Sequence, residues 1–330
     1  MKKPIYIFSS GELHRKGNTL VLIKDKGKKY IPITLVSEIY ILGEVSITKK
    51  LLEFLASSEI LVHFFNYHGF YIGTYYPREH YNSGFMILKQ AEHYLDKNKR
   101  VKLAAKFVEG AIWNMQQVLN YYAQRGRNVT QYIDELASFH QEIHTAKSVG
   151  ELMGIEGNAK QSYYNAFNEI IRDKNFKFTK RTKRPPESRI DSILSFLNSL
   201  LYVSILREIY MTHLDPRIGF LHESNFRSFT LNLDVADIFK PIIVDRTMFS
   251  LINRRTLNEN HFTKELKGIF LNQKGKQIAV NEFENKMKTT IKSKQTKRKA
   301  SYRRLIRIEL YKIEKHLIGE KEYTPFKSEW

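Results

Sequence analysis

The sequence contains no cysteine, little proline or tryptophan, and no long uninterrupted apolar run. Its 330 residues include 8 Pro, 2 Trp and no Cys. Without thiols, the chain forms no disulfide, thiolate zinc site or iron–sulfur cluster, and it has no cysteine nucleophile. The most apolar windows, 60–65 and 193–206, are too short or too interrupted for the ~18–20 apolar residues of a bilayer span. No signal peptide is predicted either, so we expect a soluble, cytoplasmic protein.

Acidic side chains are scarce relative to basic ones. The chain has 34 Asp and Glu against 54 Lys and Arg, a formal net charge of +20 at pH 7. Such an excess repels itself and favours a polyanionic partner, first nucleic acid and second an anionic membrane surface. A generally basic protein without such a partner is the alternative. Hydrophobic residues at 42% indicate a folded core rather than a disordered basic tail.

The positive charge is concentrated in the later part of the chain. Residues 1–80 hold 11 basic and 7 acidic side chains, so most of the excess follows them. One basic run occupies 177–189, and a second places ten basic against two acidic residues over 292–315. Either run can follow a phosphate backbone or form an ordinary solvated face.

The hydropathy period changes near residue 76. Before it, short apolar and β-branched runs alternate with turn residues, which is typical of strands. After it, apolar residues recur at three and four spacing, which predicts helices. Ser148 and Glu151 fit a capping box, so one of these helices is expected to begin at Val149. We predict an α+β fold: a small β domain over 1–76, a linker over 77–83 and a larger all-α domain over 84–330. The predicted strands are 5–8, 20–23, 29–32, 38–42, 61–65 and 70–75, with a short helix at 48–57, and the predicted later helices are 85–125, 149–172, 190–213, 233–239, 246–257 and 303–318.

Glu156 lies at the edge of the apolar stripe of the predicted helix 149–172. Gly154 and Gly157 flank it, at a cost of up to ~1 kcal/mol each relative to alanine inside a helix. That cost is understandable where a ligand or another backbone must approach closely. The same glutamate is also placed to pair with Lys160 at i+4 on an ordinary helix surface. The local pattern leaves both interpretations open.

A second polar cluster follows the predicted helix 190–213. His222 lies in a loop that contains glycine and proline, and Asp234 and Asp237 are three residues apart on one predicted helix face. A glutamate, a histidine and one or two aspartates together form a mixed oxygen and nitrogen site, which suits Mg²⁺ or Mn²⁺ rather than structural zinc. Taken alone, this cluster is weak support for a site.

Several short motifs, in one order over residues 150–245, resemble the CRISPR-associated integrase family, the metal-dependent nuclease subunit that inserts new spacers into CRISPR arrays. They are MGIEGNA at 153–159 with YY at 163–164, KRPP at 183–186, SF at 195–196 with NSLLY at 198–202, LDP at 214–216 with GFLHE at 219–223, and LNLD at 231–234. FSSG at 8–11 and the order of β and helical regions match as well, so the similarity covers nearly the whole chain. Asp191 stands where the family usually has Asn, and Leu197 where Gly is frequent.

The resemblance implies a role for each member of the polar clusters. By motif matching, the metal ligands of the family fall on Glu156, His222 and Asp237, with Mg²⁺ or Mn²⁺ as the ion. Asp234 is the adjacent acid, which supports the site or substitutes in it, and Lys240 matches a basic position close to DNA. The family forms homodimers through the β domain and assembles with a small ferredoxin-like CRISPR-associated adaptation subunit around a protospacer duplex.

The implied reaction is a phosphoryl transfer in which the 3′-hydroxyl of a protospacer strand attacks a phosphodiester of the CRISPR repeat. Basic residues of the two runs are expected to bind the backbone of double-stranded DNA rather than to read its sequence. Two alternatives stay open: a DNA-repair or junction-resolving metal-dependent nuclease, and a nucleic-acid-binding module without catalysis. The residues predicted to contact the DNA backbone are Arg181, Arg184, Lys297, Arg298 and Arg303.

Overall fold

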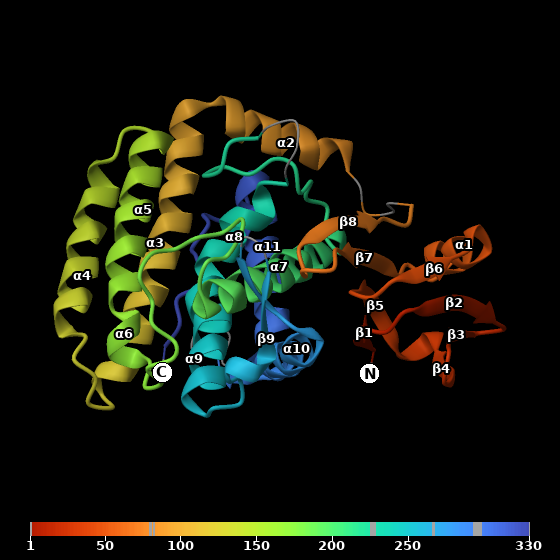
Figure 1. Cartoon of the computed structure of the whole chain (residues 1–330). Helices are drawn as coiled ribbons and strands as arrows, with labels where there is room; N and C mark the ends of the chain where they lie inside the picture. Colours follow the sequence, from red (N-terminus) through yellow and green to blue (C-terminus); the bar gives the residue numbers. More distant parts are fainter. Residues whose placement is uncertain are drawn as a thin grey trace. The chain divides into compact units, whose positions relative to one another are not determined.

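The structure, a computed structural model, describes residues 2–78, 81, 83–224, 229–265, 268–292 and 299–329. The chain divides into two units, Met1–His80 and Tyr81–Trp330, and the division falls inside the predicted linker. The first unit is built mainly of strands and the second mainly of helices, as Figure 1 shows. The predicted α+β class is therefore confirmed.

The N-terminal unit contains two four-stranded sheets around one apolar core. Leu13, Val36, Ile39, Leu51 and Val62 are fully buried there. The first sheet has the order β1-β5-β7-β8 and consists of β1 (Lys3–Ile7), β5 (Val36–Ile41), β7 (Leu61–Phe65) and β8 (Tyr71–Tyr75), of which only β8 is antiparallel to its neighbour. The second has the order β4-β3-β2-β6 and consists of β4 (Gly27–Pro32), β3 (Thr19–Lys24), β2 (Gly11–Lys16) and β6 (Val45–Ile47). The unit also contains the 3₁₀ turn η1 (Ile33–Leu35) and the predicted short helix α1 (Lys49–Ser57).

The second unit is a helical assembly with two short strand pairs. The pairs are antiparallel and were not expected in a region predicted as all-α. Its helices are α2 (Gly84–Leu95), α3 (Lys97–Ala123), α4 (Thr130–Thr145), α5 (Val149–Asn165), α6 (Phe167–Ile170), α7 (Arg189–Tyr210), α8 (Leu231–Lys240), α9 (Arg246–Asn253), α10 (Gln273–Lys288) and α11 (Tyr302–Leu317). A π-helical turn, η2 (Pro241–Asp245), joins α8 to α9, and the remaining elements are η3 (Glu259–His261), β9 (Phe262–Glu265), β10 (Gly268–Leu271), β11 (Thr290–Lys292) and β12 (Lys299–Ser301).

Helix α7 is the most apolar of these helices. By length and composition it meets the requirements of a membrane span, but 72% of its most apolar window is buried inside the protein. It packs against α8, α10 and α11, and Ile193, Leu197 and Leu201 are fully buried. Its apolar character is therefore explained by its place in the core of the helical unit.

Helix α5 begins where the capping box predicted. The Glu151 N–H donates to Ser148 Oγ at 3.2 Å, and the Lys147 N–H donates to Glu151 Oε2 at 2.8 Å. Each side chain thus satisfies one backbone donor at the start of the helix. The buried side of α5 packs against α3 and α4, which fixes the direction in which Glu156 and Lys160 project.

Candidate active site

Two predicted site residues, Glu156 and Asp237, are linked by one lysine, and a third, His222, lies next to Asp237. Lys160 forms an ion pair with Glu156 one turn earlier on α5, and its Nζ atom also lies 3.3 Å from Asp237 Oδ1 on α8. The Nε2 atom of His222, in the loop before α8, is 3.9 Å from Asp237 Oδ2. The expected pairing of Glu156 with Lys160 is observed, and through Lys160 it lies next to Asp237 and His222; we call Glu156, His222 and Asp237 the acidic–histidine cluster.

Asp234 orients the histidine of this cluster. Its fully buried carboxylate accepts hydrogen bonds from the backbone N–H groups of Phe220 at 2.5 Å, Leu221 at 3.1 Å and His222 at 2.9 Å. The same carboxylate lies 2.8 Å from His222 Nδ1. An anion at Nδ1 favours the tautomer that carries its proton there, which leaves the Nε2 lone pair directed toward Asp237. These contacts of Asp234 are thus with His222 and the backbone of its loop.

Gly219 makes this arrangement possible. A Cβ atom there would lie 2.7 Å from the Thr230 carbonyl carbon and 2.8 Å from Asp234 Oδ2, closer than real contacts allow. Gln90 on α2 holds the loop from the other side, because its amide nitrogen donates to the Asp215 and Ile218 carbonyls, both at 3.0 Å. The loop is thus pressed against the start of α8, and its backbone donors are aimed at the aspartate.

Three basic side chains surround the carboxylate of Asp237 and change its pKa. Burial by itself would raise the pKa of Asp237, but Lys160, Lys240 and His222 together hold it well below the usual range. Burial lowers the pKa of Lys160 to about 8, against the attraction of Asp237. The Nζ atom of Lys240 donates to Asp237 Oδ1 at 2.5 Å and lies 4.8 Å from the centre of the Tyr202 ring. The aspartate is therefore an anion that balances two nearby ammonium groups.

A divalent cation fits one side of this cluster. The buried Oδ2 atom of Asp237 accepts no hydrogen bond and faces His222 Nε2. Two atoms that bind one ion at about 2.1 Å lie at most about 4.2 Å apart, and the observed separation of 3.9 Å is within that limit. Two carboxylates and an imidazole are donors suited to Mg²⁺ or Mn²⁺. In the part of the chain that the structure describes, no three such side chains form a ready-made metal site, and Glu156 contacts Lys160 instead.

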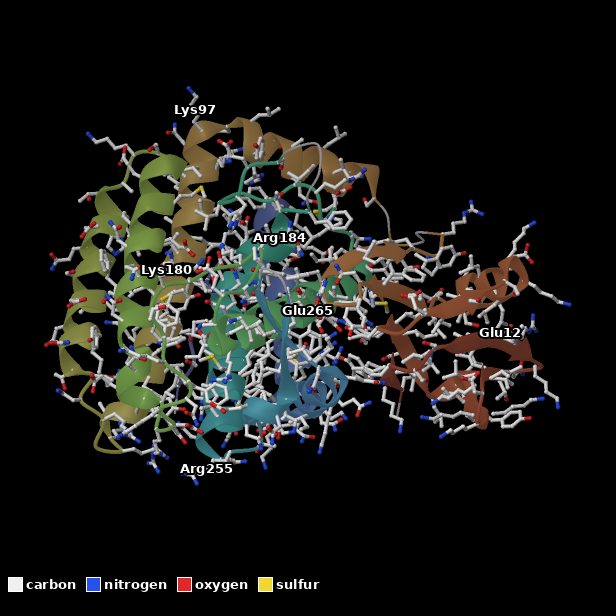
Figure 2. All side chains as sticks on the ribbon, in the orientation of Figure 1. Glu12, Lys97, Lys180, Arg184, Arg255 and Glu265 are labelled. Atoms are coloured by element: carbon white, nitrogen blue, oxygen red, sulfur yellow. The ribbon has the colours of Figure 1, made fainter. Side chains whose placement is uncertain are left out.

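The predicted DNA contacts fall into different environments. Arg181 is mostly buried and pairs with Asp191 at 3.0 Å, and Arg303 donates to Glu284 at 2.9 Å, so both already serve inside the protein. Arg184 is exposed in the segment between α6 and α7, and Figure 2 marks its place and that of Lys180. Lys240 belongs to the surroundings of Asp237 as described above. Lys297 and Arg298 lie outside the described residues.

Sequence reasoning missed one charged group near the cluster, Asp245, whose pKa burial raises to about 7. Lys183, which the basic run and the KRPP motif had marked, also lies near the cluster; burial, and then the repulsion of Lys240, lowers its pKa. Nothing in the described protein lies within 4 Å of a Cβ at Gly154 or Gly157, so no backbone approaches there.

The two-unit fold defines an α+β protein whose helical unit carries the acidic–histidine cluster, and comparison with known proteins gives its family. The family model of CRISPR associated protein Cas1 matches residues 5–285. The chain is 56% identical over all 330 residues to CRISPR-associated endonuclease Cas1 2 of Thermodesulfovibrio yellowstonii, covering 100% of both chains. It is 47% identical over 319 residues to CRISPR-associated endonuclease Cas1 of Thermotoga maritima, covering 97% of this chain and 98% of the relative. The chain therefore belongs to the Cas1 family.

Solved structures agree with this assignment. A CAS1 protein from Thermotoga maritima superposes with a TM-score of 0.89 at 46% identity and covers 99% of this chain and 100% of its own. A casposase bound to integration product has the same fold, with a TM-score of 0.89 at 22% identity over 100% of this chain and 95% of its own. Both curated relatives are named endonucleases, and the chain matches nearly their full length. The chain is therefore assigned to the nuclease class.

Proposed function

We propose that this chain is a divalent-metal-dependent DNA endonuclease and integrase of CRISPR adaptation. The observation that carries the proposal is the unpaired, buried Oδ2 atom of Asp237, which faces a histidine nitrogen whose tautomer Asp234 sets. Glu156, His222 and Asp237 would hold Mg²⁺ or Mn²⁺. When bound, the ion supplies Lewis acidity that lowers the pKa of an attacking hydroxyl and offsets charge on the phosphate.

The proposed reaction conserves the number of phosphodiester bonds. The 3′-hydroxyl oxygen of a protospacer strand bonds to a phosphorus atom of the CRISPR repeat, and the bond from that phosphorus to the departing 3′-oxygen breaks. The departing oxygen takes up a proton from solvent as the attacking hydroxyl loses one, so no nucleotide hydrolysis is required. Water in place of the hydroxyl gives strand cleavage.

The residues of this chain divide the remaining work. Asp234 keeps the proton on His222 Nδ1, so that Nε2 stays available as a donor. Lys160 and Lys240 carry positive charge beside the reacting phosphate and reduce the electrostatic cost of the transition state. Glu156 is free to act as a ligand once it turns away from Lys160, and the ammonium group is then able to approach a phosphate oxygen.

A strand-joining assay tests the proposal. Linear duplex DNA with free 3′-hydroxyl ends is incubated with a supercoiled plasmid that carries a CRISPR repeat, with Mg²⁺, Mn²⁺ or a chelator. Joined product is expected with either ion, none with chelator and none from Asp237→Asn. Asp25→Asn, at an exposed position of the β unit, is the matched control and retains activity. Joining in chelator contradicts the metal role, and cutting of branched DNA without joining indicates the junction-resolving alternative.

The partners follow from the same proposal. Two solved structures with this fold are described as Cas6-RT-Cas1–Cas2 complexes, with TM-scores of 0.85 and 0.68 at 18% identity. We propose that this cytoplasmic chain binds double-stranded DNA as a homodimer joined by the β unit, together with a small ferredoxin-like adaptation subunit. Sedimentation of the full chain is expected to give a dimer, and removal of residues 1–80 to abolish it. A full chain that sediments as a monomer at micromolar concentration contradicts this part.

A further inference from the structure

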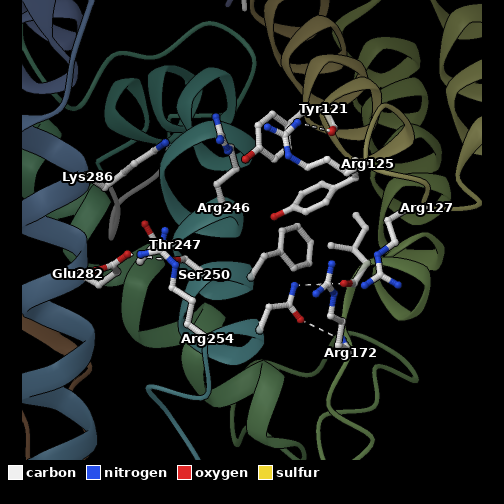
Figure 3. Close-up of a pocket in the computed structure, with 14 residues that line it drawn as sticks. Tyr121, Arg125, Arg127, Arg172, Arg246, Thr247, Ser250, Arg254, Glu282 and Lys286 are labelled. Carbon is white, nitrogen blue, oxygen red and sulfur yellow. Dashed lines mark hydrogen bonds between the residues drawn. The ribbon is translucent and has the colours of Figure 1, made fainter.

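The helical unit contains a cationic pocket that is distinct from the acidic–histidine cluster. It has a volume of about 390 Å³. Its lining comes from α9, from α10, from the end of α3 and from the segment that follows α6, as Figure 3 shows. None of Glu156, His222, Asp234 or Asp237 lines it. Its size lies in the range of about 300–1,000 Å³ that is typical of small-molecule sites.

The lining is cationic. One lining side chain, Glu282, is acidic, and it accepts a hydrogen bond from Ser250 Oγ at 2.9 Å. In the described part of the chain, the carboxylate of Glu282 forms no ion pair with the cations around it. The pocket therefore sets one acidic side chain against six basic ones. We call it the arginine pocket; its six cations are Arg125, Arg127, Arg172, Arg246, Arg254 and Lys286.

Two of these guanidinium groups share one aromatic ring. The guanidinium carbon of Arg125 lies 3.6 Å from the centre of the Tyr121 ring, and that of Arg246 lies 4.3 Å from it. Cation–π contacts of this kind hold like charges near each other and orient their planes. Burial lowers the pKa of Lys286 to about 7, and repulsion by Arg246 adds to this against the attraction of Glu282. An anion in the pocket would relieve this repulsion.

The other wall of the pocket is aromatic. The partly exposed ring of Tyr122 meets Phe249 edge to face with centroids 5.4 Å apart, and Phe249, like the lining residue Ile170, is fully buried behind the lining. A simple inorganic anion makes no stacking contact with an aromatic ring. A nucleobase joined to a phosphate would use both halves of the pocket, since bases stack on aromatic side chains and phosphates pair with arginine.

We propose that the arginine pocket binds a 5′-phosphorylated nucleotide unit, with the phosphate at the guanidinium groups and the base against the ring of Tyr122. Two sources supply this chemistry: a free nucleotide, or the phosphorylated end of a DNA strand. The proposal does not depend on the metal or on strand joining, because the pocket shares no residue with the acidic–histidine cluster.

The first test compares two oligonucleotides that differ only at the 5′ end. A fluorescent single-stranded hexamer is titrated with the full chain in chelator, once with a 5′-phosphate and once with a 5′-hydroxyl. The phosphorylated strand is expected to bind about tenfold more tightly, as one charge-assisted contact would give. Equal affinities, together with no binding of a mononucleotide in the second test, overturn the proposal.

The second test uses unmodified protein and small competitors, and it separates the two sources. Displacement of the phosphorylated strand by deoxyadenosine monophosphate, but not by deoxyadenosine, assigns the pocket to a free nucleotide. A retained 5′-phosphate preference without such displacement assigns it to a strand end. Displacement by inorganic phosphate as effective as by the nucleotide overturns the proposed role of the aromatic wall.

The third test places the effect in the pocket. The double substitution Arg172→Gln with Arg254→Gln removes two exposed cations that have no carboxylate partner among the described residues, so the fold is expected to persist. It should abolish the preference for the 5′-phosphate. Lys177→Gln, an exposed lysine of the same unit outside the lining, is the matched control and keeps the preference. A double variant with the normal melting temperature and the full preference overturns the assignment.

Discussion

The acidic–histidine cluster and the arginine pocket differ in how their positive charges are balanced. Beside the cluster, Lys160 and Lys240 both contact one buried aspartate, Asp237. In the pocket, Arg172 and Arg254 have no carboxylate partner in the described part of the chain. A basic composition therefore produces two kinds of site: one with lysines tied to an acid, suited to a cation and its substrate, and one with unbalanced arginines, suited to an anion.

Removal of Asp237 is expected to have the largest effect on this contrast. Asp237→Ala takes away a proposed ligand, leaves Lys240 without its carboxylate partner and leaves Lys160 with Glu156 alone. Strand cleavage and joining should fall by at least about a thousandfold, and the free energy of unfolding by about 3 kcal/mol, as when one partner of a buried pair is lost. Gel assays and urea unfolding measure the two effects, with Asp25→Ala as the exposed control. Unchanged stability would show that the lysines are not held by this carboxylate.

Asp234 should have a smaller effect that acts through the histidine. Asp234→Asn keeps the shape but weakens the hold on His222 Nδ1, and losses of this kind typically reduce metal affinity by about 10–100-fold. Calorimetric titration with Mn²⁺ measures the affinity directly, without reference to turnover. An affinity equal to that of the unmodified chain would assign Asp234 to the fold alone.

Arg181 tests whether a basic residue of the sequence runs serves DNA or the fold. Its guanidinium pairs with buried Asp191, so Arg181→Gln should lower the free energy of unfolding by about 2 kcal/mol and leave the salt dependence of DNA binding unchanged. Arg184→Gln, at an exposed neighbour, is the counterpart and is expected to change the salt dependence without destabilisation. A decrease of about 0.9 in the salt slope of Arg181→Gln would restore this residue as a phosphate contact.

Lys286 is expected to affect the pH dependence of stability rather than DNA binding or activity. Its pKa is lowered from 10.5 to about 7, so between these values the unfolded chain holds more of this proton than the folded chain does. Stability from this group therefore rises with pH across that interval. The melting temperature of the unmodified chain, measured relative to Lys286→Met, should rise between pH 7 and pH 9.5. A difference that stays constant would mean that the ammonium group is well solvated.

The strands of the β unit show what hydropathy patterns can and cannot reveal. The predicted strand 61–65 is observed as β7, because its residues are almost all buried. Strand β2 was missed, since only Leu13 among its six residues is buried, and β6 was missed because its alternation extends over only three residues. Both are held by pairing with neighbouring strands, and backbone pairing leaves little trace in the sequence.

The helical unit adds a second lesson. Helix α10 buries Ala279, Val280, Phe283 and Met287 at helical spacing, so its signal was present and was overlooked. Helix α4 buries only two apolar residues, and its periodicity is correspondingly weak. The antiparallel pairs of this unit have strands of three or four residues, too short for any period to show.

The neighbours of the candidate site residues were not predictable from local pattern. The resemblance implied Glu156, His222 and Asp237 as ligands, and the structure places Lys160 between Glu156 and Asp237 and His222 beside Asp237. The second contact of Lys160, with Asp237 seventy-seven positions away, depends on how α5 and α8 pack, which no local pattern records. The arginine pocket combines residues of α3, α9 and α10 and was not predicted for the same reason.

The π-helical turn η2 lies in the chain between Asp237 and Arg246. A turn of this kind carries one residue more than the α-helical repeat, and one residue corresponds to about 100° of rotation. The turn thus sets the rotation of α9 relative to α8 about the helix axis. Deletion of a single residue there would restore an even repeat and rotate one helix relative to the other, so that only one of the two sites could keep its proper orientation. The five residues of η2 therefore determine how the two sites are oriented relative to each other, although none of them lines the arginine pocket or belongs to the acidic–histidine cluster.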